Sequence, residues 1–188
     1  MNTVNLEKSE VNFSLSKKIY EQLIKGNMIN RSDYSAQSNQ FVSNPLFNEL
    51  RANFYQYDTQ YQMMGMKLKD EESYFYLVSL GAEKATTQQI KAKIYAAAIV
   101  IGRYIMHDTG KLYDYLKNIN YGASIEEFKE ININDSYKHI LEKSRIDNIE
   151  QAIKLLVERN LIVKTKSNRY VFSDSGVALF RSIIAANS

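Results

Sequence analysis

Residues 147–172 read DNIEQAIKLLVERNLIVKTKSNRYVF, and this stretch decides the predicted fold. Asp147 is a suitable helix N-cap, and apolar residues follow it at helical spacing: Ile149, Ala152, Ile153, Leu156 and Val157. Asn160 is a residue type that often ends a helix in the left-handed conformation. Two β-rich runs, LIVKTK and RYVF, then flank the polar turn Ser167–Asn168 and predict a hairpin. A helix that leads directly into a hairpin is typical of a winged helix, in which the hairpin is the wing.

The segments on either side complete this unit. Ser124-Ile-Glu-Glu127 has the spacing of a capping box and predicts a short helix that ends near Glu130. A second helix is expected at about residues 135–143, and a last helix is expected to begin at Ser173 or Asp174. The apolar residues of the last helix are Val177, Leu179, Phe180, Ile183 and Ile184. This order of helices around a hairpin predicts a C-terminal winged-helix domain.

The N-terminal third repeats the order. Ser14 or Ser16 is expected to open a helix that ends at Gly26, and residues 28–29 are expected to form a short strand. The inward face of that helix consists of Leu15, Ile19, Leu23 and Ile24. Further along, the runs MKL and YFYLV surround an acidic turn and predict a second hairpin.

Two helices are expected between the short strand and this second hairpin. Asn30 or Ser32 would cap a polar helix that ends near Ser43. Pro45, in a position that favours proline, would open a helix that ends at Gly65. The apolar stripe of that helix consists of Leu46, Leu50, Phe54, Tyr57 and Tyr61. Three helices followed by a hairpin predict a second winged helix in the same chain.

A long helix rich in Ala and Ile is expected between these units, at about residues 86–108, and a further short helix at residues 111–118. Because the long helix is apolar on more than one face, we expect both domains or another subunit to bury it. The predicted fold class is therefore mainly α with small β-hairpins (α+β), with tandem winged-helix domains joined by a packed helix. The expected parts are an N-terminal winged-helix domain at 1–82, a connecting helical segment at 83–123 and a C-terminal winged-helix domain at 124–188.

The composition argues against catalysis. The 188 residues include no cysteine, which excludes disulfides and thiolate metal sites. The two histidines, His107 and His139, are too far apart in sequence to suggest a metal site. Residues 109–112 resemble a fragment of a P-loop but lack its earlier glycine and the hydroxyl after lysine. We therefore predict no catalytic residue, no metal and no cofactor.

The sequence also lacks the marks of a membrane or secreted protein. The N-terminal residues are polar, without the apolar core of a signal peptide. The uncharged apolar stretch at residues 94–102 is far shorter than the ~20 residues that span a bilayer. We therefore expect a soluble, cytoplasmic protein.

Positive charge is concentrated near the C-terminal hairpin. Within residues 152–172 the only acidic residue is Glu158, and the basic residues are Lys154, Arg159, Lys164, Lys166 and Arg169. These five are the predicted DNA-binding residues, and phosphate contacts of this kind give weak sequence selectivity. The alternative is a solvated basic hairpin without a ligand. The first hairpin carries an acidic turn at residues 70–72 and is expected not to bind DNA.

Tyrosines and phenylalanines cluster in the N-terminal half. In the run Tyr74-Phe75-Tyr76 only one of the two alternating sets can face the core, which leaves either both tyrosines or Phe75 outside. Tyr55 is also expected outside, next to a helix stripe that faces the core. Since exposed tyrosines are typical of partner interfaces, Tyr55, Tyr74 and Tyr76 are the predicted partner-binding residues.

Two stretches carry a family resemblance: LIKGNMINRSDY at residues 23–34 and NPLFNELRANFYQYDTQYQMMGMKLKDEESYFYLVS at residues 44–79. They resemble the small accessory subunit of bacterial condensins, MukE and its MksE relatives, and the related subunit of the Wadjet plasmid-defence system. The motifs cover about residues 15–80, and the remainder agrees in element order. The chain is shorter than MukE and lacks its long acidic tail, which favours the MksE branch.

The resemblance implies a function. Such subunits are tandem winged-helix proteins that dimerise and bind a kleisin, MukF or MksF, which bridges the heads of an SMC ATPase. For this chain it implies a non-catalytic, nucleoid-associated subunit that acts in chromosome organisation and segregation or in plasmid defence. It would bind kleisin and a second copy through the N-terminal domain and the middle helix, and contact double-stranded DNA through the second wing.

Two other functions fit the same residues. One is a stand-alone dimeric winged-helix transcription regulator, which would bind one DNA sequence tightly. The other is a scaffold whose basic wing binds nothing. A subunit of a larger complex predicts instead weak, salt-sensitive DNA binding and tight binding to a kleisin-like chain.

Overall fold

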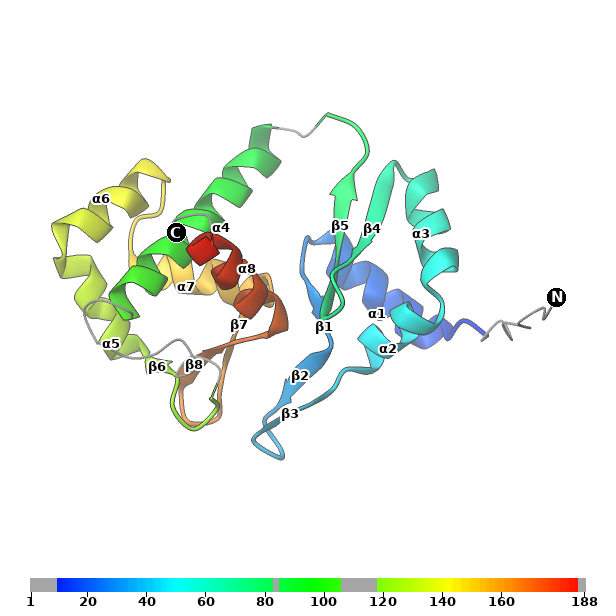
Figure 1. Cartoon of the computed structure of the whole chain (residues 1–188), viewed down its shortest axis with the longest axis horizontal. Coiled ribbons are helices and arrows are strands. Elements are labelled where there is room, and N and C mark those ends of the chain that lie inside the picture. The colour runs from blue at the N-terminus through cyan, green and yellow to red at the C-terminus, as the bar shows by residue number, and fades with distance from the viewer. Residues whose placement is uncertain (1–9, 83–84, 106–117, 186–188) are drawn as a thin grey trace.

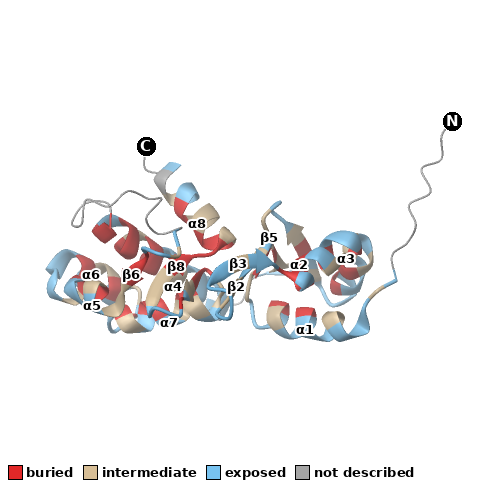
Figure 2. Ribbon diagram, turned by 90° about the horizontal axis from the view of Figure 1, so that it is seen from below, coloured by how far each residue is buried: buried red, intermediate tan, exposed pale blue. Residues whose placement is uncertain are grey.

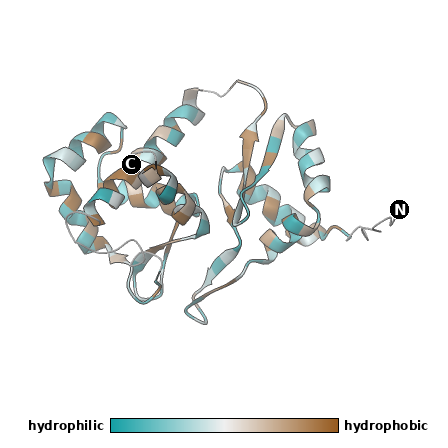
Figure 3. Cartoon of the chain, viewed as in Figure 1, coloured by the Kyte–Doolittle hydropathy of each residue, from teal (hydrophilic) through white to brown (hydrophobic). Residues whose placement is uncertain are grey.

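The computed structural model describes residues 10–82, 85–105 and 118–185, which form two lobes with separate hydrophobic cores (Figure 1). The N-terminal lobe, residues 10–82, buries one cluster of apolar side chains. The C-terminal lobe, residues 85–105 and 118–185, buries the other. Figure 2 shows the buried residues inside each lobe, and Figure 3 shows hydrophobic residues along β5 and α8. The predicted class, mainly helical α+β with small antiparallel sheets, is confirmed.

The first helix, α1 (Phe13–Ile24), begins earlier than predicted. Asn12 caps it, because the Asn12 side chain accepts hydrogen bonds from the amides of Ser14 and Leu15. The predicted caps, Ser14 and Ser16, are therefore wrong, because they lie two and four residues after the observed cap. The helix ends where predicted, before Gly26, which has a φ of +77°.

The sheet of the N-terminal lobe has three antiparallel strands in the order β1-β5-β4. The predicted hairpin is confirmed as β4 (Met66–Asp70) and β5 (Tyr74–Ser79), and β1 (Ile29–Asn30) lies one residue later than expected. Phe75 is fully buried on the face that packs against the helices. Its neighbours Tyr74 and Tyr76 therefore lie on the other face.

The predicted polar helix at residues 30–43 is wrong. This segment forms a two-stranded antiparallel ribbon of β2 (Ser32–Ser35) and β3 (Gln40–Ser43), which we call the ribbon, residues 32–43. Tyr34 and Phe41 are partners across the strands, and their rings meet edge to face at 6.2 Å. The turn uses Asn39 at a φ of 51°, and Asn39 Oδ1 accepts a hydrogen bond from the Tyr34 hydroxyl. The Ser35 hydroxyl accepts from the Ser38 amide and the Asp33 carboxylate accepts from the Tyr34 amide, and local bonds of this kind compete with those of a helix.

The apolar stripe that begins at Pro45 belongs to two helices instead of one. These are α2 (Pro45–Ala52) and α3 (Phe54–Met63), separated by Asn53 at φ −118° and ψ 29°. Asn53 is buried, and its side-chain amide donates to Glu49 Oε1 at 2.9 Å. This local bond accompanies the break, while the predicted stripe still faces the core.

The C-terminal lobe follows the predicted order closely. Its elements are α4 (Ala85–Arg103), β6 (Ala123–Ser124), α5 (Ile125–Lys129), a 3₁₀ turn (Glu130–Ile133), α6 (Asp135–Lys143), α7 (Ile149–Glu158), β7 (Ile162–Lys164), β8 (Arg169–Phe172) and α8 (Asp174–Ala185). The capping box is present, since the Ser124 and Glu127 side chains each accept from the other's backbone amide. The cap of α7 is Asn148, one residue after the predicted Asp147. The strand order is β6-β8-β7.

The long helix α4 is part of the C-terminal core. Its second half is buried, with Ala97, Val100 and Ile101 in the cluster formed with α6, α7 and α8. Most of its first half, residues 85–95, is exposed. The N-terminal lobe therefore does not bury this half, and of the two alternatives expected for this helix only burial by another subunit stays a prediction. The predicted short helix at residues 111–118, except for its last residue, lies outside the described residues.

Candidate partner and nucleic-acid surfaces

The two lobes meet at a joint of polar groups centred on Asn30 and Asn160. The Asn30 side chain donates to the Asn160 carbonyl at 2.9 Å and accepts from the Ser175 amide at 2.8 Å. The Asn160 side chain donates in return to the Met28 carbonyl at 2.8 Å. Asn160 adopts a φ of 58°, the left-handed conformation predicted for the end of this helix. Because Asn30 is 6% exposed, these bonds are shielded from water and hold the lobes in one orientation.

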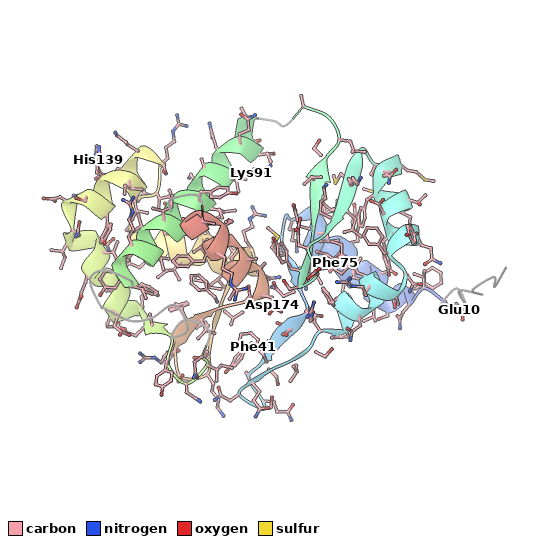
Figure 4. All side chains as sticks on the ribbon, in the orientation of Figure 1. Glu10, Phe41, Phe75, Lys91, His139 and Asp174 are labelled. Atoms are coloured by element: carbon pink, nitrogen blue, oxygen red, sulfur yellow. The ribbon has the colours of Figure 1, made fainter. Side chains whose placement is uncertain are left out.

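The ribbon extends this joint toward the C-terminal hairpin, which we define as residues 162–172. The Ser32 amide donates to Asp174 Oδ2 at 2.9 Å, and the Lys166 amide donates to the Tyr34 hydroxyl at 2.7 Å. Figure 4 shows Phe41 and Asp174 in the region where the lobes meet. The ribbon of one lobe and the hairpin of the other are thus held side by side.

Two predicted DNA-binding residues, Lys164 and Lys166, are exposed on the C-terminal hairpin. Lys164 is the last residue of β7, and Lys166 lies in the turn. Neither side chain has an ion pair within the described part of the chain. Thr165 between them is buried, and its hydroxyl accepts from the Arg169 amide, which closes the turn. The two lysines therefore remain available to an external anion.

Arg169, also predicted to bind DNA, is held by groups of its own lobe. Its guanidinium lies 3.1 Å from Glu127 Oε2 and donates to the carbonyl oxygens of Gly122 and Tyr121. Glu127 is the capping-box residue of α5, so one carboxylate supports both the helix start and the hairpin. Arg169 fixes the base of the C-terminal hairpin instead of joining the exposed lysines.

The predicted residues of α7, Lys154 and Arg159, lie apart from the hairpin lysines. Lys154 is exposed and pairs with Glu158 at 3.9 Å. Arg159 donates to the Lys25 carbonyl of the N-terminal lobe, and its Nε is buried without a hydrogen-bond partner among the described atoms. A Cβ at Gly26 would lie 2.6 Å from its guanidinium. Arg159 is therefore a joint residue.

Tyr74 and Tyr76 form a stacked pair on the sheet face opposite the helices. Their ring centroids are 5.8 Å apart at an interplanar angle of 27°, and the Tyr76 hydroxyl donates to Glu71 Oε1. Burial, and then the charges of Glu71, Tyr76 and Tyr95, raise the pKa of Tyr74 to about 12. Tyr95 belongs to α4, so the pair lies near the exposed half of that helix. These hydroxyls stay neutral at physiological pH, as an aromatic contact surface requires.

Tyr55 lies on a different surface. It is 82% exposed at the start of α3, and its ring meets Phe54 edge to face at 5.7 Å. Phe54 in turn contacts Phe75 on the helix-covered face of the sheet. Because Tyr74 and Tyr76 occupy the other face, the three predicted partner-binding residues do not form one site.

Sequence reasoning missed an exposed apolar stripe on α1 and was wrong to place Ile24 on the inward face of this helix. Phe13, Tyr20 and Ile24 are 85%, 46% and 39% exposed at spacings of seven and four residues. That spacing places them on one face of a helix. The spacing is visible in the sequence and could have predicted this apolar face. The charge of Tyr20 contributes to raising the pKa of Tyr61 to about 12, after burial and Tyr57. The Ser16 hydroxyl of α1 and the Tyr57 hydroxyl of α3 lie 2.6 Å apart in a hydrogen bond, so α1 lies beside α3.

No feature of the described residues suggests catalysis. No group of three His, Cys, Asp or Glu side chains is placed to hold a metal ion there. A polar cavity of about 80 Å³ at the joint has room for a few water molecules. His139 is exposed on α6, while His107 and the P-loop-like residues lie outside the described ranges. None of the described helices has the length and hydropathy needed to cross a bilayer.

Both lobes are covered by a match to a known protein family. The family model described as "Condensin complex protein MksE" matches residues 14–184. No curated protein matches the chain significantly. The matched range includes the joint, the ribbon, the C-terminal hairpin and the tyrosine pair.

Proposed function

Because the chain belongs to the MksE family of condensin complex proteins, we propose that it is a non-catalytic accessory subunit that binds kleisin within an SMC complex. The observation that carries this proposal is the family match over residues 14–184. The two lobes are then tandem winged-helix domains, with β4–β5 and β7–β8 as their wings. ATP hydrolysis belongs to the SMC partner, and the complex acts at the nucleoid.

We place the kleisin contact at Tyr74 and Tyr76. Stacked, partly buried tyrosines present a large apolar area with few rotamers to immobilise, which suits a protein interface. The nearby first half of α4 adds Ile90 and Tyr95, which are 37% and 49% exposed. Tyr55 is a separate proposed contact on the opposite side of the lobe.

We place the contact between two copies of the chain on the α1 stripe of Phe13, Tyr20 and Ile24. A single helix face can pair with itself about a two-fold axis, as homodimer interfaces require. Met63, at the end of α3, is a further apolar side chain of this lobe that is 82% exposed. Dimer and kleisin surfaces then lie on different elements.

We place the DNA contact at Lys164 and Lys166, with Arg169 and Arg159 in supporting roles. Two exposed lysines on a hairpin bind phosphates without reading bases. Glu158 is exposed beside Lys154 on α7, and half-buried Glu150 lies one turn before them, so this charge pattern argues against a base-reading helix in the major groove. The alternative of a stand-alone transcription regulator depends on such a helix, so the accessory subunit is favoured.

The test compares two double variants in affinity purification from cells that express the complex. Tyr74→Ala with Tyr76→Ala should lose kleisin and the SMC ATPase while remaining dimeric. Phe13→Ala with Tyr20→Ala should become monomeric and retain kleisin, which makes each variant the control of the other. If both retain every partner and the dimer, both surface assignments are wrong. If the wild type recovers neither kleisin nor ATPase, the function itself is wrong.

A further inference from the structure

The ribbon places a second β-turn next to the C-terminal hairpin. Tyr34 provides the connection, because its hydroxyl accepts from the Lys166 amide at 2.7 Å and donates to Asn39 Oδ1 at 2.9 Å. One side chain thus touches the turn of the hairpin and the turn of its own ribbon. The distance between the two turns is therefore set by the fold. Lys166, whose side chain is exposed, belongs to the contact.

The end of the ribbon is polar but uncharged. Residues 35–40 read SAQSNQ and carry no charge. Gln37, Ser38 and Gln40 are exposed, and their side chains make no hydrogen bond within the described ranges. Each glutamine amide offers two donors and one acceptor oxygen. Asp33, the acidic residue of the ribbon, pairs with Val42, and Gln40 pairs with Ser35 at the end of the ribbon, so both side chains lie on the face away from Tyr34.

This chemistry complements that of the hairpin. Lysines bind phosphates as point charges, whereas glutamine amides bond to sugars, phosphates and base edges without a net charge. A two-stranded ribbon has dimensions that the major groove of B-DNA admits. A neutral amide-bearing turn beside a basic turn therefore matches a groove beside its phosphate backbone.

We propose that the ribbon and the C-terminal hairpin form one surface for double-stranded DNA, in which Lys164 and Lys166 bind phosphates and Gln37 and Gln40 reach into the adjacent groove. This inference rests on the proposed DNA contact and adds its second half. Tyr34 is a positioning residue, since it holds the two turns together without touching DNA. The ribbon contributes affinity that does not depend on salt.

The test is the salt dependence of DNA binding by the full-length protein, measured by fluorescence anisotropy with a random-sequence duplex. Replacing Lys164 and Lys166 by Ala should lower affinity and reduce the slope of log K against log salt by about 1.8, at about 0.9 per phosphate contact. Replacing Gln37 and Gln40 by Ala should lower affinity about tenfold, from two lost hydrogen bonds, and leave the slope unchanged. The matched control replaces Gln60 and Gln89, exposed glutamines far from the ribbon, and should bind as the wild type does.

The outcomes separate the two proposals. No binding at low salt, or an unchanged slope in the lysine variant, would overturn the DNA contact itself. Suppose that the slope of log K against log salt falls in the lysine variant but the Gln37 and Gln40 variant binds DNA with wild-type affinity. The lysine contact would then stand, and the proposed contribution of the ribbon to DNA binding would be wrong. Loss of kleisin instead of DNA by the glutamine variant would assign the ribbon to a protein partner and contradict the inference. All four glutamines are exposed, so circular dichroism should show unchanged folding in both variants.

Discussion

Asn30 donates a 2.9 Å hydrogen bond to the carbonyl oxygen of Asn160, a residue 130 positions later in the chain. This bond and its neighbours make the joint between the lobes polar and specific. A polar joint with satisfied groups has one favoured geometry, because each unpaired donor or acceptor would cost free energy. The tyrosine pair of one lobe and the exposed hairpin lysines of the other, which we propose as the kleisin and DNA contacts, are thereby held at a constant distance.

Asn30→Ala should lower the free energy of unfolding by about 2 kcal/mol, because the buried Ser175 amide loses its acceptor. Urea denaturation followed by circular dichroism measures this. Asn48→Ala, on the exposed side of α2, is the matched control and should change stability by less than about 0.5 kcal/mol. Equal effects in both variants would show that the joint contributes nothing specific.

Asn160→Ala should destabilise the protein more than Asn160→Gly does. Both variants lose the hydrogen bond to the Met28 carbonyl. Only the Ala variant also has the steric strain of a Cβ in a left-handed backbone at a φ of 58°. The difference should be about 1 kcal/mol in favour of Gly. Thermal unfolding of the two variants side by side checks it, and the reverse order would contradict the assigned conformation.

Gly176→Ala should be strongly destabilising, by about 3 kcal/mol, because a Cβ there would collide with the Leu161 carbonyl. Gly176 lies in the first turn of α8, which packs against the strand that leads into the C-terminal hairpin. Gly81→Ala is the control, since the nearest atom to its Cβ would be 3.9 Å away. Comparable melting temperatures for the two variants would argue against this packing.

Arg169→Ala should cost about 1–2 kcal/mol of stability, because Glu127 and two carbonyl groups lose their donor. Lys164→Ala should change stability by less than about 0.5 kcal/mol, since its side chain is exposed. Denaturant titrations of the two variants separate a supporting residue of the hairpin from a ligand-contacting one. If Arg169→Ala leaves the free energy of unfolding unchanged, Arg169 does not support the hairpin and belongs with the lysines as a ligand-contacting residue.

Stability should fall as pH rises from about 10 to about 12. Burial raises the pKa of Tyr57, Tyr61 and Tyr74 to about 12, above the value of 10 that they have in the unfolded chain. In this window the unfolded state has released protons that the folded state retains, so deprotonation favours unfolding. Absorbance at alkaline pH should show a late-titrating group of tyrosines. Titration of all tyrosines near pH 10 with the fold intact would contradict their burial.

Local signals in the sequence predicted much of the fold. The capping box at Ser124 and Glu127, the helix before Asn160 and both hairpins rest on contacts between near neighbours, and the structure confirms them. The helix break at Asn53 and the ribbon were missed. The ribbon has no apolar stripe of its own, and its geometry is completed by Lys166 and Asp174, more than 130 residues away.

The candidate sites were harder to predict for the same reason. Composition identified five basic residues as one group, but the partner of Arg159 is the Lys25 carbonyl, 134 residues away, and that of Arg169 is Glu127, 42 residues away. Spacing alone does not reveal such long-range partners. Alternation in β5 did limit Tyr74, Phe75 and Tyr76 to two arrangements, and the burial of Phe75 selects one.

The central claim is that this protein acts as a subunit of an SMC–kleisin complex. Its most direct test is affinity purification of the tagged wild-type protein from its native host, with nuclease treatment and mass spectrometry. We expect recovery of a kleisin and a large coiled-coil ATPase in fixed proportion, unchanged by nuclease. Recovery of neither protein, together with a footprint at a single promoter, would contradict the account and establish a stand-alone regulator.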